Sequence, residues 1–118
     1  MKITDKTLET FKEWYGNHII GIYSDLNGQL AGRPDTFFRL HFDFQYGMLD
    51  EFFSSLGIDI FIIPCFDAKY DDYRYVYYIS GMELEDDDDE FKDYEDKSLC
   101  KAAAIIEANN YYNSKNGQ

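Results

Sequence analysis

The stretch from residue 58 to residue 80 constrains the fold of this chain most. Residues 58–66 are almost wholly apolar, and residues 73–80 are rich in tyrosine and aliphatic side chains. β-Branched and aromatic residues of this kind pack well on a pleated surface. The polar segment 67–72 between them is typical of a hairpin loop. We predict two adjacent antiparallel strands, with Pro64 at a sheet edge or a bulge because proline cannot donate to a ladder.

Two helices and two further strands are predicted before this hairpin. The apolar spacing of residues 3–15 predicts a helix that ends at Gly16. A short apolar run predicts a strand at 19–23. Residues 36–44 alternate between apolar and polar side chains, which is typical of a half-buried strand, and residues 45–56 change to a helical period.

A final helix is expected after the hairpin, and it completes an α+β fold. Asp96 or Ser98 can cap this helix, which extends to about Tyr112. The order of elements predicts a single domain over residues 1–118, an α+β sandwich with a mainly antiparallel sheet of three to four strands and about three helices. The inner side of the last helix is expected to hold Leu99, Ala103 and Ile106, widened by Ala102, Ile105 and Ala108.

Two segments resemble parts of a known group of proteins. Residues 42–53, with the sequence FDFQYGMLDEFF, and residues 98–113, with the sequence SLCKAAAIIEANNYYN, are similar to segments of short phage and mobile-element proteins that contain an α-β-α sandwich domain. The resemblance implies that fold and a phage or bacterial origin. The group has no general catalytic signature, so the resemblance implies no functional residues. Tyr46 stands where the group usually has tryptophan.

The acidic residues gather in one part of the chain. The net charge is −12, and residues 67–96 contain 13 of the 23 acidic residues but three of the 11 basic ones. Direct binding to nucleic acid or to an anionic membrane is disfavoured, because both need cationic side chains. A basic protein partner is favoured through electrostatic steering. We expect residues 83–96 to form a mobile acidic loop, because like charges repel one another.

Tyrosines share this acidic segment, and tyrosine is a common contact residue in protein interfaces. We therefore predict a non-catalytic protein that binds a basic partner, for which a nucleic-acid-binding protein is a candidate. It would act as a phage-type inhibitor that imitates the charge of a nucleic acid. An exposed tyrosine face is also compatible with a homodimer. The predicted partner-binding residues are Tyr70, Asp71, Asp72, Tyr73, Tyr75, Glu85, Asp86, Asp87, Asp88, Asp89, Glu90, Asp93 and Tyr94.

Two other functions stay open at this point. A pocket near His41 could bind a small ligand or support an enzyme, and the run at 85–90 could bind a divalent cation. The run lacks the spacing and the glycine of a calcium loop. Catalysis by cysteine would need an exposed thiol beside a histidine, and we expect Cys65 and Cys100 to be buried. We predict no catalytic residue and no cofactor, and a location in the cytoplasm of a bacterial host.

Overall fold

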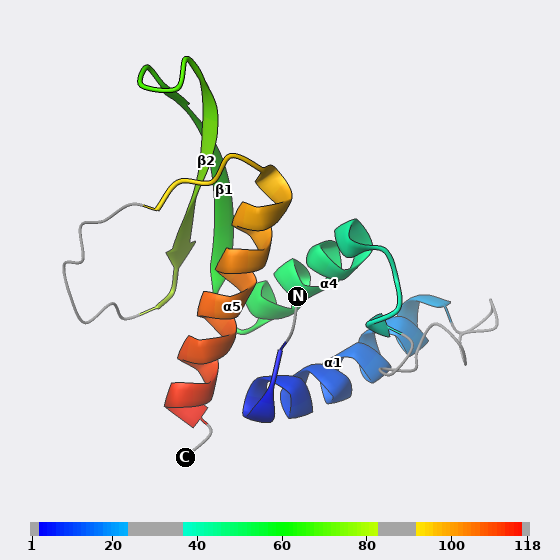
Figure 1. Cartoon of the computed structure of the whole chain (residues 1–118). Coiled ribbons are helices and arrows are strands. Elements are labelled where there is room, and N and C mark those ends of the chain that lie inside the picture. Colours follow the sequence, from blue (N-terminus) through cyan, green and yellow to red (C-terminus); the bar gives the residue numbers. More distant parts are fainter. Residues whose placement is uncertain (1–2, 24–36, 83–91, 117–118) are drawn as a thin grey trace.

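A computed structural model describes residues 3–23, 37–82 and 92–116 of the chain (Figure 1). These residues form three helices and one two-stranded antiparallel sheet, which confirms the α+β class and the antiparallel pairing. None of the helices in these ranges is long and apolar enough to cross a membrane. The elements in chain order are α1 (Asp5–Tyr23), α4 (Phe42–Ser55), β1 (Asp59–Asp67), β2 (Asp72–Ser80) and α5 (Lys97–Asn116).

The predicted hairpin is confirmed, and its strands pair without a slip. The ladder extends from Asp59 opposite Ser80 to Asp67 opposite Asp72. The Asp67 side chain accepts a hydrogen bond from the backbone amide of Lys69 at 2.9 Å, which closes the loop in the way typical of aspartate turns. Asp71 takes a left-handed conformation with φ 52°, which aspartate tolerates better than most residues.

Pro64 lies at a sheet edge, as predicted. Its partner across the ladder is Tyr75, whose backbone N–H and C=O both bond to Tyr94 on the far side of β2. In an antiparallel ladder, two opposed residues either both direct their backbone N–H and C=O toward the other strand or both direct them away from it. The position where Pro64 lacks an N–H therefore faces away from β2, and no ladder bond is lost.

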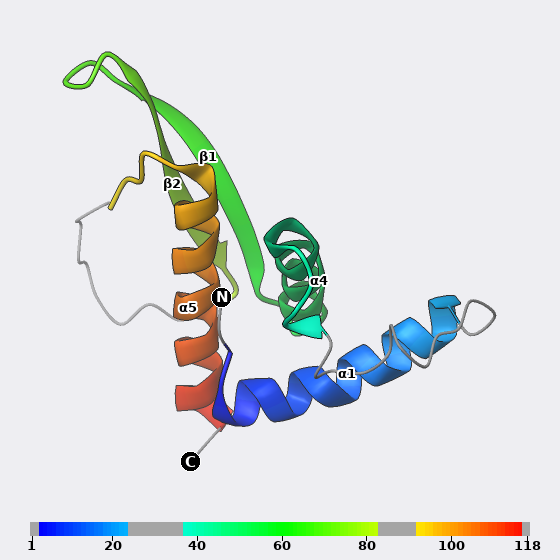
Figure 2. The ribbon, with the colours of Figure 1, turned by 45° about the vertical axis from the view of Figure 1, so that its right-hand side comes forward.

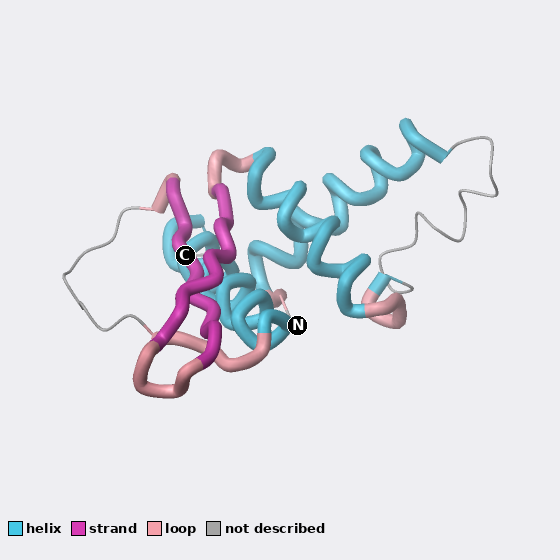
Figure 3. Tube along the Cα trace, turned by 90° about the horizontal axis from the view of Figure 1, so that it is seen from above, coloured by secondary structure: helices cyan, strands magenta, loops and turns pink. Residues whose placement is uncertain are grey.

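One face of the hairpin is covered by α5, which lies along it in two views (Figures 2 and 3). Ile60 and Ile79 on this face are buried, and they meet the buried side of α5. The small side chains of Ala104 and Ala108 let the helix approach the strands closely. Asp96 caps α5, because its Oδ1 accepts a hydrogen bond from the Ser98 amide at 2.7 Å.

The side of α5 predicted to face the core is wrong by about one residue. Leu99 and Ile106 were expected inside, but their exposed fractions are 58% and 48%. The helix has alanines on several sides, so its apolar pattern does not mark one stripe clearly. Ile105 and Ala108 are buried as predicted, and the other buried residues of the helix are Cys100, Ala104 and Asn109.

The strand predicted at 19–23 is wrong, because α1 continues through Gly16 to Tyr23. A glycine inside a helix costs only about 1 kcal/mol relative to alanine. The preceding turns bury Phe11 and Tyr15 completely, and this packing offsets that cost. The end predicted at Gly16 is therefore wrong as well.

The strand predicted at 36–44 is wrong too, and its alternating pattern belongs to a turn followed by a helix. Phe37 is fully buried against Phe11, with ring centroids 4.9 Å apart. The side chain of Gln45 donates a hydrogen bond to the Leu40 carbonyl at 2.7 Å and holds this turn. The helix α4 then begins at Phe42, earlier than predicted, and Phe44 is 43% exposed. A sheet of three to four strands is thus not seen in the described residues, which show two.

An aromatic core joins α1, α4 and the turn before α4. The Phe11 ring contacts the rings of Phe37 and Phe52, and Tyr15 and Trp14 extend the cluster. Such tilted and edge-on ring pairs add about 0.5–1.5 kcal/mol each beyond the burial of area. The core therefore lies where the helices meet, near the open end of the hairpin and away from its turn (Figure 1).

Candidate partner-binding surface

The turn end of the hairpin projects beyond the start of α5 (Figures 1 and 2). Tyr70 and Tyr73 at this end are 51% and 59% exposed, and Asp71 and Asp72 between them are exposed as well. Phe66 lies beside Tyr73, with the two rings edge-on and their centroids 5.5 Å apart. The structure thus brings four of the predicted partner-binding residues together on one protruding turn.

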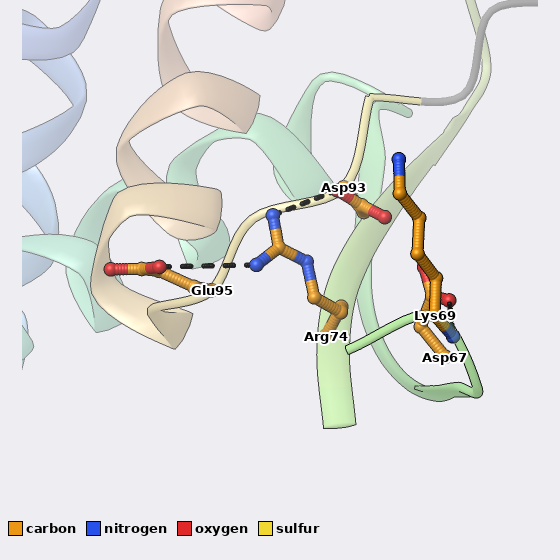
Figure 4. Close-up of polar contacts among 5 residues, drawn as sticks. All are labelled: Asp67, Lys69, Arg74, Asp93 and Glu95. Atoms are coloured by element: carbon orange, nitrogen blue, oxygen red, sulfur yellow. Dashed lines mark hydrogen bonds and ion pairs between the residues drawn. The ribbon is translucent and has the colours of Figure 1, made fainter. Parts of the chain in front are cut away.

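Arg74 connects this turn to the acidic segment that precedes α5 (Figure 4). Its Nη2 donates to Asp93 Oδ1 at 3.0 Å, and its Nη1 lies 3.9 Å from Glu95 Oε2. The guanidinium also lies over the Tyr70 ring, 4.4 Å from the centroid. The hydrogen bond to Asp93 is the main cause that raises the pKa of Arg74. Asp93 is therefore partly neutralised by Arg74 and is less available to a partner than Asp71 or Asp72.

Tyr75 and Tyr94, both predicted to bind a partner, are joined to each other by two backbone hydrogen bonds. Each backbone amide donates to the other's carbonyl at 2.8 Å, so the segment around Tyr94 pairs with the outer edge of β2. The Tyr94 ring is nearly parallel to that of Tyr77, with centroids 6.3 Å apart. Burial, followed by a hydrogen bond to Glu107, raises the pKa of Tyr77. Tyr75 and Tyr94 are thus half-buried and contribute to the fold.

The acidic run itself falls outside the described residues. This applies to Glu85, Asp86, Asp87, Asp88, Asp89 and Glu90, and to the larger part of the predicted loop 83–96. Within the ranges that the structure describes, no group of three or more His, Cys, Asp or Glu side chains could hold a metal ion. The cation site predicted at 85–90 stays a prediction.

The candidate catalytic side chains are not arranged as a catalytic set. His41 is exposed, and its Nδ1 accepts a hydrogen bond from the Asp43 amide at 3.1 Å, so it caps α4. Cys65 is exposed on β1, contrary to the prediction, because its face of the hairpin carries no described helix. Cys100 is buried as predicted, and burial raises the pKa of its thiol.

A hollow of about 390 Å³ lies at the other end of the molecule, away from the hairpin turn. This volume falls within the range of small-ligand sites, but His41 does not line it. A pocket near His41 stays a prediction. The residues that line the hollow are Leu56, Ile58, Gly81, Tyr111, Tyr112, Lys115 and Asn116.

The sequence interpretation missed an apolar surface on the hairpin. The face that points away from α5 exposes Phe61, Ile63 and Tyr78, with exposed fractions of 49%, 42% and 55%. The signal was present, because residues 60–66 are uncharged at every position instead of at alternate ones. Such a pattern is typical of a strand buried on both faces. The described helices cover only one of them.

Comparison with known proteins gives no relative from which a function could be transferred. No protein-family model matches the chain, and neither the curated proteins nor the solved structures gave a significant match. The resemblance to short phage and mobile-element proteins therefore stays a prediction.

Proposed function

We propose that this chain is a non-catalytic acidic protein that binds a basic protein partner. The observation that carries the proposal is the protruding hairpin turn, where exposed Tyr70 and Tyr73 flank exposed Asp71 and Asp72. Tyrosine brings a large contact area at low entropic cost, and the carboxylates select a cationic partner. The adjacent run at 85–90 adds six acidic residues to the same part of the chain.

A nucleic-acid-binding protein is the partner class that this charge favours. The surface of such a protein is cationic because it must neutralise phosphates. An acidic chain with a net charge of −12 would compete for that surface. In this proposal the protein is an inhibitor of the phage type that acts in the cytoplasm of a bacterial cell.

The experiment is a pull-down from bacterial lysate at low salt, followed by titration of the purified retained partner. The parent is compared with Asp71→Asn/Asp72→Asn and with a variant in which Asp86 to Asp89 are changed to Asn. The matched control is Glu9→Gln/Glu13→Gln, which removes two exposed charges from α1. We expect a retained basic protein, a steep loss of affinity with salt, and at least a tenfold loss in each hairpin or acidic-run variant.

Equal binding by the parent and both charge variants would reject this function. Binding that is insensitive to salt would reject it as well, because screened charges cannot then supply the affinity. A loss in the control variant of the same size would show that only the total charge matters and not the hairpin turn.

A further inference from the structure

The outer face of the hairpin, meaning the face that points away from α5, has a defined pattern of side chains. Alternate residues of each strand share a face. From the open end to the turn, the cross-strand pairs on this face are Asp59 with Ser80, Phe61 with Tyr78, Ile63 with Val76, Cys65 with Arg74, and Asp67 with Asp72. The rings of Phe61 and Tyr78 lie side by side, with centroids 6.2 Å apart. The face is thus apolar in its middle.

Carboxylates lie at both ends of this apolar patch. Asp59 is at one end, where its Oδ1 also accepts a hydrogen bond from Ser54 of α4, and Asp67 and Asp72 are at the other. Arg74 is the single cation on the face, and its side chain is only 17% exposed because Asp93 and Glu95 pair with it. A partner would therefore meet an apolar centre with negative charge on either side, which complements a segment with an apolar stripe and cationic ends.

The edge of β1 is less suitable for a partner than its face. In an antiparallel pair, every second residue of a strand directs its backbone N–H and C=O away from the neighbouring strand. In β1 these residues are Ile60, Ile62, Pro64 and Phe66. Pro64 lacks the N–H that a pairing strand would need in the middle of this row, and proline is a common way to protect an edge. Addition of a partner strand is therefore disfavoured, while Phe61, Ile63 and Tyr78 on the face are exposed and no described helix covers them.

The size of the outer face matches one helix. From Asp59 to Asp67 a strand spans about 27 Å. A helix of about 18 residues has the same length. Two strands with their side chains offer a surface about as wide as one helix, which has a diameter of about 10 Å.

We propose that the outer face of the hairpin binds an amphipathic basic helix of the partner protein. The apolar stripe of that helix covers Phe61, Ile63, Val76 and Tyr78, and its lysine or arginine residues meet the carboxylates at the two ends. This inference rests on the proposed function for the basic character of the partner, and it adds the shape and the apolar contact. A second copy of this chain fits less well, because its own carboxylates would oppose those of the first.

Cys65 provides a direct probe, because its thiol lies on the outer face and is exposed. The ligand used is a synthetic 18-residue helix of leucine and lysine with an apolar stripe. A peptide with the same composition but a scrambled order, and one with glutamate in place of lysine, are the controls. We measure the rate at which a maleimide alkylates Cys65, located by mass spectrometry, as each peptide is added. The amphipathic basic helix is expected to slow the reaction at least tenfold, and the two controls less than twofold.

Variants separate the outer face from other exposed apolar residues. Phe61→Ser/Tyr78→Ser is expected to weaken binding at least tenfold. Leu99→Ser/Ile106→Ser, which removes a comparable exposed pair on α5, is expected to change it less than twofold. Ile63→Lys places a like charge in the patch and is expected to weaken binding too, while Ile63→Leu retains it. Circular dichroism of each variant shows that the fold is kept.

Four results would overturn the inference. A Cys65 thiol that does not react in the isolated chain would mean that the face is already covered. Protection that grows with protein concentration alone would identify a second copy as the occupant. Equal protection by the scrambled peptide, or unchanged binding by Phe61→Ser/Tyr78→Ser, would remove the role of the face. In the last case the proposed function still stands if Asp71→Asn/Asp72→Asn abolishes binding to the natural partner.

Discussion

At the scale of single residues, two asparagines of α5, buried Asn109 and half-buried Asn113, join the two ends of the described chain. Asn109 Oδ1 accepts a hydrogen bond from the Thr4 amide, and Asn113 Oδ1 accepts one from the Thr7 amide, both at 2.8 Å. The Thr7 hydroxyl, which is fully buried, donates to the same Asn113 oxygen at 2.9 Å. Amide groups in the first turn of a helix have no partner within it. Asn113 of α5 satisfies such an amide at Thr7, and Asn109 satisfies that of Thr4 just before the helix.

Changing Asn109 to alanine should therefore destabilise the protein. Asn109 is 4% exposed, so its loss leaves the Thr4 amide without a partner in a largely buried place. We expect the free energy of unfolding to fall by about 1–3 kcal/mol. Urea denaturation measures this change. Asn116→Ala, at an exposed position near the end of the same helix, is the control and should cost less than about 0.5 kcal/mol.

Two glycines should respond to alanine with opposite signs. Gly81 has φ 88°, and a Cβ there would overlap the backbone carbonyl of Gly57. Gly81→Ala should lower the free energy of unfolding by about 2 kcal/mol or more, since strain and a clash add. Gly47 lies in α4 with open space around it, so Gly47→Ala should raise that free energy by about 0.5–1 kcal/mol. Thermal denaturation of both variants tests the pair, and equal effects would contradict the structure.

At the scale of elements, α4 and the start of β1 bring three carboxylates together, those of Asp50, Glu51 and Asp59. Ser54 Oγ donates to Asp59 Oδ1 at 2.8 Å, and Asp50 lies in the preceding turn of α4. Burial, followed by the carboxylates of Asp59 and Glu51, raises the pKa of Asp50, while Lys101 of α5 lowers it in part. The folded state thus holds the proton of Asp50 more tightly than the unfolded state does.

Asp50→Asn should stabilise the protein at pH 7. The raised pKa of Asp50 stabilises the folded protein at low pH, where the carboxyl is protonated. This stabilisation is lost as the pH rises from the usual aspartate pKa, near 3.9, through the higher pKa of the folded state. The variant removes that loss, so its advantage should disappear at about pH 3. Denaturation at both pH values measures it. Glu13→Gln on the exposed side of α1 should show no comparable gain, and an Asp50→Asn variant that is less stable at pH 7 would contradict the assigned environment.

The two cysteines should differ strongly in their reactivity toward a thiol reagent. Cys65 is exposed on the outer face, and Cys100 is buried in α5 with a raised pKa. One thiol of the native chain should react rapidly with a thiol reagent, and the second only after denaturation. Cys65→Ser should leave no rapid reaction. Two rapid thiols in the native parent would show that Cys100 is not buried between α5 and the rest of the fold.

At the scale of the whole molecule, stability and the candidate surface lie in different places. The extents of 51, 33 and 19 Å describe a flat, elongated body. The aromatic core lies where α1 and α4 meet. The hairpin turn projects at the other end (Figure 1), and its Tyr70 and Tyr73 are exposed. The turn end of the hairpin projects away from this core, so its exposed side chains can change for binding at little cost in folding, whereas Ile60 and Ile79 farther along the hairpin are buried.

Substitutions at the two ends should therefore differ strongly in stability. Phe52 is fully buried in contact with Phe11, so Phe52→Ala should cost about 3–5 kcal/mol. Tyr73 is 59% exposed, so Tyr73→Ala should cost less than about 1 kcal/mol even with the loss of its contact to Phe66. Chemical denaturation measures both values. A large loss from Tyr73→Ala would show that the turn is part of the stable core.

The sequence by itself determined the elements whose signals are local. The hairpin, the end of α4 within one residue of the predicted 56 and the cap of α5 at Asp96 follow from turn chemistry, helix period and capping, which act within a few residues. Only the tertiary structure decided the other features. Residues 36–44 alternate like a strand, but burial of Phe37 against Phe11 holds residues 37–44 as a turn and a helix. The inner side of α5 and the exposed outer face of the hairpin depend on where α5 packs, and that contact joins residues far apart in the chain, which no local pattern records.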